Sequence, residues 1–255
     1  MIIDTHTHLD HKKFADDVEE VMERGREAGV EAFIIPGADP ADLPRAIELA
    51  EKHDDVYFAV GVHPYDIDKF DEAIFEHLSH PKCVAVGECG LDYYRLPKDE
   101  AQKEQTKRRQ KEVFRRQIEI AKEHDLPLIV HIREASSDAK ELLEAHAGSR
   151  GGVLHCYNAS PILLDLANRG FYYGIGGVVT FHNAKKLTQI LPRIPLERIV
   201  IETDAPYLTP HPHRGKRNEP AYTTHIAQKI ADLRGMEYDE VCRATTQNAR
   251  RLFGL

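Results

Sequence analysis

Eight apolar segments of strand length, separated by stretches with helical periodicity, constrain the fold of this chain more than any other feature. Intervening stretches place apolar residues at helical spacing among charged ones, for example over residues 16–28, 41–52, 100–124 and 134–146, and two more helices are expected at 220–234 and 238–252. Strand followed by helix, eight times over, predicts a parallel sheet closed into a (β/α)8 TIM barrel of the α/β class, with an open doubly wound sheet as the alternative. The expected strands are residues 2–5, 32–35, 56–62, 83–87, 128–130, 153–155, 171–175 and 199–202.

The length of 255 residues fits one barrel of this kind, and no linker or repeat divides the chain, so we expect a single domain over residues 1–255. With 42% hydrophobic and 30% charged residues, the composition excludes a disordered or collagen-like chain. We find no secretory signal, no apolar run long enough for a membrane span, and four cysteines without a CxxC pair. A cytoplasmic protein without membrane contact is expected, and no feature indicates an obligate protein partner.

Fifteen histidines are many for this length, and several fall where the expected strands end. His6 and His8 are two residues apart on an extended segment, so their imidazoles face the same side. The C-terminal strand ends of a barrel share one face, which is where active sites of this fold are built. Any one such residue could have a purely structural role, but six converging on one face indicate a metal site. The six candidate ligands are His6, His8, Glu88, His131, His155 and Asp204.

Six ligands suit two divalent ions better than one, because a single catalytic zinc takes about three protein ligands. Two ions about 3.5 to 4 Å apart need a bridging group, which a carboxylate can supply and an imidazole cannot. Glu88 is the candidate bridge, and Asp204 is the candidate group that orients a water molecule and accepts its proton. These two are the candidate catalytic residues. The ions could be Zn, Mn, Ni, Co or Mg, since histidine and carboxylate sites accept all of them.

The charge balance bears on the substrate. The formal net charge is -8, which argues against a broad electrostatic grip on duplex DNA. Two divalent ions would nevertheless outweigh two ligand carboxylates, so the pocket itself would be positive and would attract a phosphodiester.

Strand parity selects three residues around the ligands. Glu202 and Asp4 each lie two positions before a ligand and should point inward one layer deeper, where a carboxylate can fix a histidine ring. The alternative is that both are buried groups satisfied elsewhere in the barrel. Arg133 lies two positions after a ligand and should face the mouth, where a guanidinium can hold a phosphate oxygen; its alternative is a salt bridge at the rim.

The loops expected at the same face carry tyrosines and one basic cluster. Tyrosine rings can stack on bases or pack beneath loops, and the sequence leaves both open for Tyr65, Tyr93, Tyr94, Tyr157 and Tyr207. The loop after the eighth strand is locally basic and could contact a DNA backbone. Its candidate substrate-binding residues are Arg214 and Asn218, with Lys216 and Arg217 between them.

A set of motifs in fixed order resembles the TatD family of metal-dependent deoxyribonucleases over the whole chain. Amidohydrolase relatives share the His-x-His pair and the late aspartate but commonly bridge their metals with a modified lysine, whereas this chain has a glutamate after the fourth expected strand. The motifs are DTHTH at residues 4–8, GVHP at 61–64, GECGLD at 87–92, PLIVHIR at 127–133, HCY at 155–157, ETDAP at 202–206 and NARRLF at 248–253.

The resemblance implies a barrel with a two-metal centre and 3'-to-5' exonuclease activity, or related phosphodiester hydrolysis, on DNA single strands or duplex ends. It also implies that His63 contacts the substrate. One ion would be held by His6, His8, Glu88 and Asp204, and the other by Glu88, His131 and His155.

Two other functions remain compatible with the sequence. The same barrel and metals could serve a small-molecule amidohydrolase or a phosphotriester-type hydrolase, because a fold does not determine a substrate. A noncatalytic, metal-dependent nucleic-acid-binding module is the second alternative, although the intact ligand set argues against it.

Overall fold

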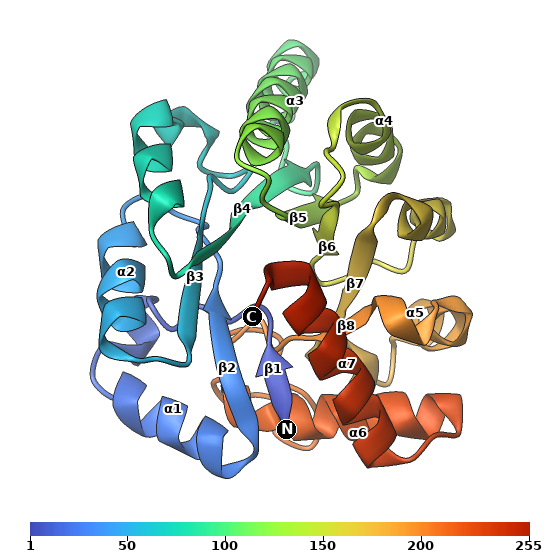
Figure 1. The fold of residues 1–255 in the computed structure, drawn as a ribbon. Helices are drawn as coiled ribbons and strands as arrows, with labels where there is room; N and C mark the ends of the chain where they lie inside the picture. Colours follow the sequence, from blue (N-terminus) through green and yellow to red (C-terminus); the bar gives the residue numbers. More distant parts are fainter.

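The computed structural model describes all 255 residues, and its centre is a single sheet of eight parallel strands in chain order. Helices surround this sheet on its outer side (Figure 1). The strands are β1 (Ile2–Asp4), β2 (Val30–Ile35), β3 (Val56–Val60), β4 (Cys83–Asp92), β5 (Leu128–Arg133), β6 (Gly152–Leu154), β7 (Phe171–Ile175) and β8 (Ile199–Ile201).

The first and last strands meet and close the barrel. The backbone nitrogen of Thr5 donates to the carbonyl of Ile201 at 3.1 Å, and Asp204 donates to the carbonyl of His6 at 2.8 Å. A parallel bridge between Thr7 and Ala205 continues the contact beyond the strands. The TIM barrel predicted from the alternation of segments is therefore confirmed, and the open doubly wound sheet is wrong.

Helices follow most strands, but two connections differ from the expected pattern. After β3 and β6 the chain forms 3-10 segments, η3 (Glu72–Ser79) and η4 (Pro161–Arg169), instead of α-helices. Each segment buries two apolar side chains three positions apart, which matches the three residues per turn of a 3-10 helix. The α-helices are α1 (Val18–Glu27), α2 (Leu43–Lys52), α3 (Glu100–Glu123), α4 (Ser136–His146), α5 (Lys185–Ile190), α6 (Thr223–Arg234) and α7 (Tyr238–Phe253).

The core has two layers because strand residues alternate between the two faces of the sheet. One layer packs the strands against the surrounding helices, and the other fills the interior of the barrel. The interior layer includes Leu252 and Phe253 of α7. Asn248 of the same helix donates to the carbonyl of Ile199, where β8 begins. Helix α7 thus covers the N-terminal end of the barrel, and the opposite end is free for a site (Figure 1).

None of the helices combines the length and the apolarity that a membrane crossing requires.

Candidate metal centre

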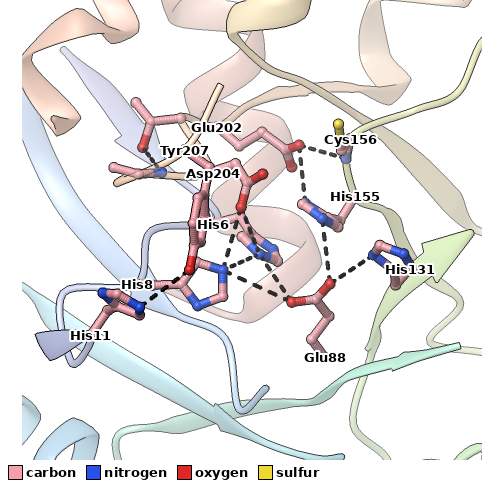
Figure 2. A network of polar contacts seen from close by, with 12 residues as sticks. His6, His8, His11, Glu88, His131, His155, Cys156, Glu202, Asp204 and Tyr207 are labelled. Atoms are coloured by element: carbon pink, nitrogen blue, oxygen red, sulfur yellow. Dashed lines mark hydrogen bonds and ion pairs between the residues drawn. The ribbon is translucent and has the colours of Figure 1, made fainter. Parts of the chain in front are cut away.

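All six candidate ligands lie together at the C-terminal end of the barrel (Figure 2). His6 and His8 follow β1, His155 follows β6, and Asp204 follows β8. The sequence predicted that Glu88 follows the fourth strand. Strand β4 instead continues to Asp92, so Glu88 lies within it. The distance from the end of each strand therefore varies, while all six side chains reach the same pocket.

Glu88 occupies the centre of this group and is only 3% exposed. Its Oε2 lies 3.4 Å from Nε2 of His6 and 4.0 Å from Nε2 of His8. Its Oε1 lies 3.0 Å from Nδ1 of His131 and 3.4 Å from Nε2 of His155. The two oxygens of one carboxylate therefore face two different pairs of imidazoles.

The first pair of imidazoles shares a second carboxylate. Oδ1 of Asp204 lies 3.4 Å from Nε2 of His8 and 3.7 Å from Nε2 of His6. Asp204 has a φ of 58°, in the left-handed region where aspartate is more readily found than most residues. These three residues offer ligand atoms that all lie within 4.8 Å of one another.

His63 lies at the second pair of imidazoles. Its Nε2 is 3.6 Å from Oε1 of Glu88, and its ring centroid is 4.5 Å from that of His131. His63, Glu88 and His131 form a second group of ligand atoms within 4.8 Å. The structure thus places His63 beside the candidate ligands, closer to the centre than the family resemblance alone required.

Two carboxylates each contact the ring nitrogen of a candidate ligand histidine that faces away from Glu88. Glu202 lies where strand parity placed it, with Oε1 3.2 Å from Nδ1 of His155, and it also accepts from the backbone nitrogen of Cys156. Asp92, for which the sequence analysis assigned no role, lies 3.0 Å from Nε2 of His131. Asp92 is four positions after Glu88 on β4, so the same parity argument could have found it.

Asp4 follows the alternative considered from the sequence, that of a buried group satisfied elsewhere in the barrel. Its carboxylate accepts from the backbone nitrogen of Thr203 at 2.9 Å and from the Thr203 hydroxyl at 2.6 Å, and it contacts no histidine ring. The two-residue period of the strand correctly predicted that Asp4 points inward, but its hydrogen-bond donors belong to Thr203, in the segment after β8. Asp4 therefore joins the chain that carries His6 to the chain that carries Asp204.

The carboxylates of the centre are ionised. Burial disfavours charge on Glu88, but the adjacent imidazoles, led by His155, outweigh this and hold its pKa well below the ordinary value. For Asp204 burial also opposes ionisation, and the hydrogen bond from His8 lowers its pKa. Two negative charges, one buried and one bordering the pocket, surrounded by nitrogen ligands suit a divalent transition metal.

The histidines differ in charge. Burial lowers the pKa of His63 to about 4, so this ring is neutral at pH 7. For His155 burial acts in the same direction, but Glu202 and Glu88 overcome it and raise the pKa to about 10. Without a metal, His155 is therefore a cation at neutral pH, whereas a metal ligand must be neutral.

Metal binding at pH 7 is accordingly expected to release protons. A group with a raised pKa keeps its proton until the pH passes that pKa, so the affinity for Zn²⁺ should increase with pH between 6 and 9. Calorimetric titration in buffers of different ionisation enthalpy measures the number of protons released. Glu202→Gln removes the largest contribution that raises the pKa of His155 and should reduce this number. The same binding heat in every buffer would contradict the prediction.

Arg133 is exposed at the mouth of the pocket. Its guanidinium lies 3.6 Å from the centroid of the Tyr94 ring and forms no ion pair. The rim salt bridge considered from the sequence is therefore wrong. The side chain borders the cavities on both sides of the centre and is free to contact a ligand.

The two candidate substrate-binding residues of the basic loop after β8 both bond to backbone carbonyls, but only Asn218 is buried, and Arg214 and Lys216 are exposed. Asn218 is buried, and its amide donates to the carbonyls of Thr203 and Tyr207 at 2.8 and 2.6 Å. Arg214 donates to the carbonyl of Thr209 at 2.9 Å and lies over a phenylalanine ring. These polar side chains satisfy backbone carbonyls of the loop, which sequence spacing could not show.

The tyrosines divide between the two alternatives. Tyr157 is buried and donates to the carbonyl of Ser160, and Tyr93 donates to Asp138, so both belong to the packing beneath the loops. Tyr65, Tyr94 and Tyr207 are 41%, 52% and 43% exposed. Only these three rings are accessible to a base.

The chain is similar in sequence and in structure to known proteins over its whole length. A family model described as "TatD related DNase" matches residues 3–254. The chain is 44% identical to the "Uncharacterized metal-dependent hydrolase YabD" of Bacillus subtilis over 261 residues, 99% of each protein. It is 35% identical to the "3'-5' ssDNA/RNA exonuclease TatD" of Shigella flexneri, over 100% of this chain and 99% of the relative. The crystal structure of YJJV, a TatD homolog from Escherichia coli, superposes with a TM-score of 0.88 at 32% identity, covering 100% and 98% of the two chains.

Proposed function

This chain belongs to the TatD-related DNase family of metal-dependent hydrolases, and from that premise we propose that it is a two-metal exonuclease that removes nucleotides from the 3' end of DNA. The observation that carries the proposal is the position of Glu88, whose two oxygens face separate pairs of imidazoles. A bridging carboxylate is what two adjacent ions require. The name of the Shigella relative supports the substrate and the polarity.

The residues divide into two ligand sets that share Glu88. His6, His8 and Asp204 would hold one ion with Oε2 of Glu88. His131 and His155 would hold the other with Oε1, and His63 lies close enough to this set to be a further ligand or a substrate contact. Bound divalent ions would supply Lewis-acid charge and lower the pKa of a water molecule.

The chain's own residues have separate tasks in hydrolysis. Asp204 is ionised and open to the pocket, so it can orient the attacking water and accept its proton. The water oxygen bonds to phosphorus, the bond from phosphorus to the 3' oxygen of the preceding nucleotide breaks, and that oxygen takes up a proton. Arg133 can neutralise charge on the phosphoryl oxygens as it develops. No side-chain nucleophile is required.

The supporting carboxylates hold the ligands in place. Glu202 and Asp92 each contact one nitrogen of a ligand histidine, so the other nitrogen is directed at the centre. Asp4 acts on the backbone, because its bonds to Thr203 keep the segments of His6 and Asp204 together. We further propose that residues 1–255 act as one domain in the cytoplasm, which is consistent with four unpaired cysteines.

Labelled oligonucleotides test this function. Protein stripped with EDTA and reloaded with Zn, Mn, Ni, Co or Mg should shorten a 5'-labelled single strand one nucleotide at a time from the 3' end, with duplex DNA and RNA as parallel substrates. A strand blocked at its 3' end is the control and should persist. Hydrolysis of a nitrophenyl ester or cyclic amide without oligonucleotide cleavage would establish the small-molecule alternative. Tight DNA binding without cleavage in any ion would establish the binding module.

A further inference from the structure

The cavities on the two sides of the metal centre differ in charge. On one side, a cavity of about 690 Å³ passes into a further hollow of about 650 Å³, and the two share Arg133 and Lys186. On the other side lies a separate cavity of about 650 Å³. Both sides border on His131, His155 and Asp204, so they meet at the centre.

The first side is basic. We define the basic track by four residues that line its two hollows: Arg133, Lys185, Lys186 and Arg193. All four are exposed, and none forms an ion pair. Beyond the metal centre, Glu134 is the only carboxylate that lines these hollows. In a chain of net charge -8, this row concentrates positive charge next to the metal centre.

Two lysines near this track are neutralised by carboxylates. Lys140 lies 2.7 Å from Asp165, and Lys111 lies 2.6 Å from Asp138. The four cations of the basic track, in contrast to these two lysines, have no carboxylate partner. Cations without a protein partner, directed at a cavity, attract an anionic ligand.

The walls of the second side carry equal numbers of positive and negative side chains. Beyond the centre its walls carry three carboxylates, Asp39, Asp42 and Asp66, and three cations, Lys12, Arg95 and the shared Arg133. The exposed ring of Tyr65 borders only this side, and the exposed ring of Tyr207 borders both. This cavity offers surfaces for a base and no excess of positive charge for a phosphate.

We propose that the basic track holds the sugar-phosphate backbone on the 5' side of the scissile phosphate, and that the opposite cavity holds the terminal nucleotide. The inference rests on the proposed exonuclease function. A 3'-terminal nucleotide carries no phosphate beyond the scissile one, so it needs a place for its base but no further cations. The retained strand carries one phosphate for every nucleotide and therefore needs the cationic side.

Salt-dependent binding tests the basic track separately from hydrolysis. The probe is a ten-nucleotide, 5'-labelled single strand with phosphorothioate linkages, which slow cleavage, added to the metal-loaded protein. For single strands each phosphate contact contributes about 0.7 to the slope of log Kd against log salt, so the double variant Lys186→Gln/Arg193→Gln should lower the slope by about 1.4. Lys122→Gln is the matched control, because Lys122 is exposed near the end of α3, where the barrel strands begin.

Substrate length provides a second readout. The ratio of kcat/KM for a ten-nucleotide strand to that for a dinucleotide should fall in the double variant and stay at the wild-type value in Lys122→Gln. Because DNA and RNA both carry a sugar-phosphate backbone, the same two measurements with DNA and with RNA strands show which nucleic acid the basic track binds. If the wild type cleaved DNA, but the double variant kept the wild-type salt slope of Kd and the wild-type kcat/KM ratio, the role of the basic track would be refuted and the exonuclease function would stand. If the wild type cleaved no oligonucleotide, but the double variant still showed the smaller salt slope, the exonuclease function would be refuted and the basic track would stand as a binding site.

Discussion

Replacing Glu88 with alanine is expected to remove one or both bound ions and to lower phosphodiester hydrolysis at least about a thousandfold, or about 4 kcal/mol in activation free energy. The reason is geometric, because Glu88 alone has oxygens directed at both imidazole pairs. Metal analysis of the purified variant and its kcat/KM on a single-stranded oligonucleotide are the two measurements.

The fold of this variant should persist, since the barrel is closed by backbone contacts that do not involve the Glu88 side chain. Circular dichroism checks this point. Glu197→Ala serves as the control, because Glu197 is an exposed glutamate in the 3-10 segment just before β8. Two equivalents of metal together with ordinary turnover in Glu88→Ala would show that the bridge is assigned to the wrong residue.

Replacing Arg133 with alanine is expected to leave both ions bound and to lower kcat/KM about a hundredfold to a thousandfold, or roughly 2.7 to 4 kcal/mol, as for other donors that act in the transition state. The guanidinium has no ion pair to stabilise in the free protein, and it borders the centre without contacting a ligand side chain. Arg133→Lys should recover part of the loss, because lysine keeps the charge but not the two-pronged geometry.

The comparison requires equal metal content in all variants. Arg243→Ala, an exposed arginine of α7, controls for the loss of a surface charge. If Arg133→Ala and Arg133→Lys both retained the wild-type kcat/KM, phosphate recognition would have to be assigned to the remaining cations of the basic track and to His63.

The geometry of the centre depends on how the barrel is closed. His6 and Asp204 belong to opposite ends of the chain, and only the meeting of β1 with the segment after β8 brings them within 3.7 Å. Asp4 and Thr203 strengthen this junction at the level just beneath the ligands. A metal site that spans the junction would also stabilise closure of the barrel, since any ligand that binds only the folded state adds to its stability.

The alternation of strands and helices was sufficient to predict the barrel, because each segment had to bury an apolar face against its neighbours in a closed parallel sheet. The six candidate ligands followed from the same reasoning, since the C-terminal ends of the parallel strands in a barrel share one face regardless of the conformation of the loops between them. Glu202 and Arg133 could be placed by the two-residue period of a strand, which is a local property of the backbone.

Only the tertiary structure decided which polar groups these side chains meet. Asp4 turned inward as predicted but bonds to Thr203 and not to a histidine ring, and Asn218, at the end of the basic loop, is buried with its amide bonded to the carbonyl of Thr203. Asp92 gained its role because β4 continues five residues further than its apolar run indicated. Local periodicity sets the direction of a side chain, whereas its hydrogen-bond partners and its burial depend on segments distant in sequence that pack against it.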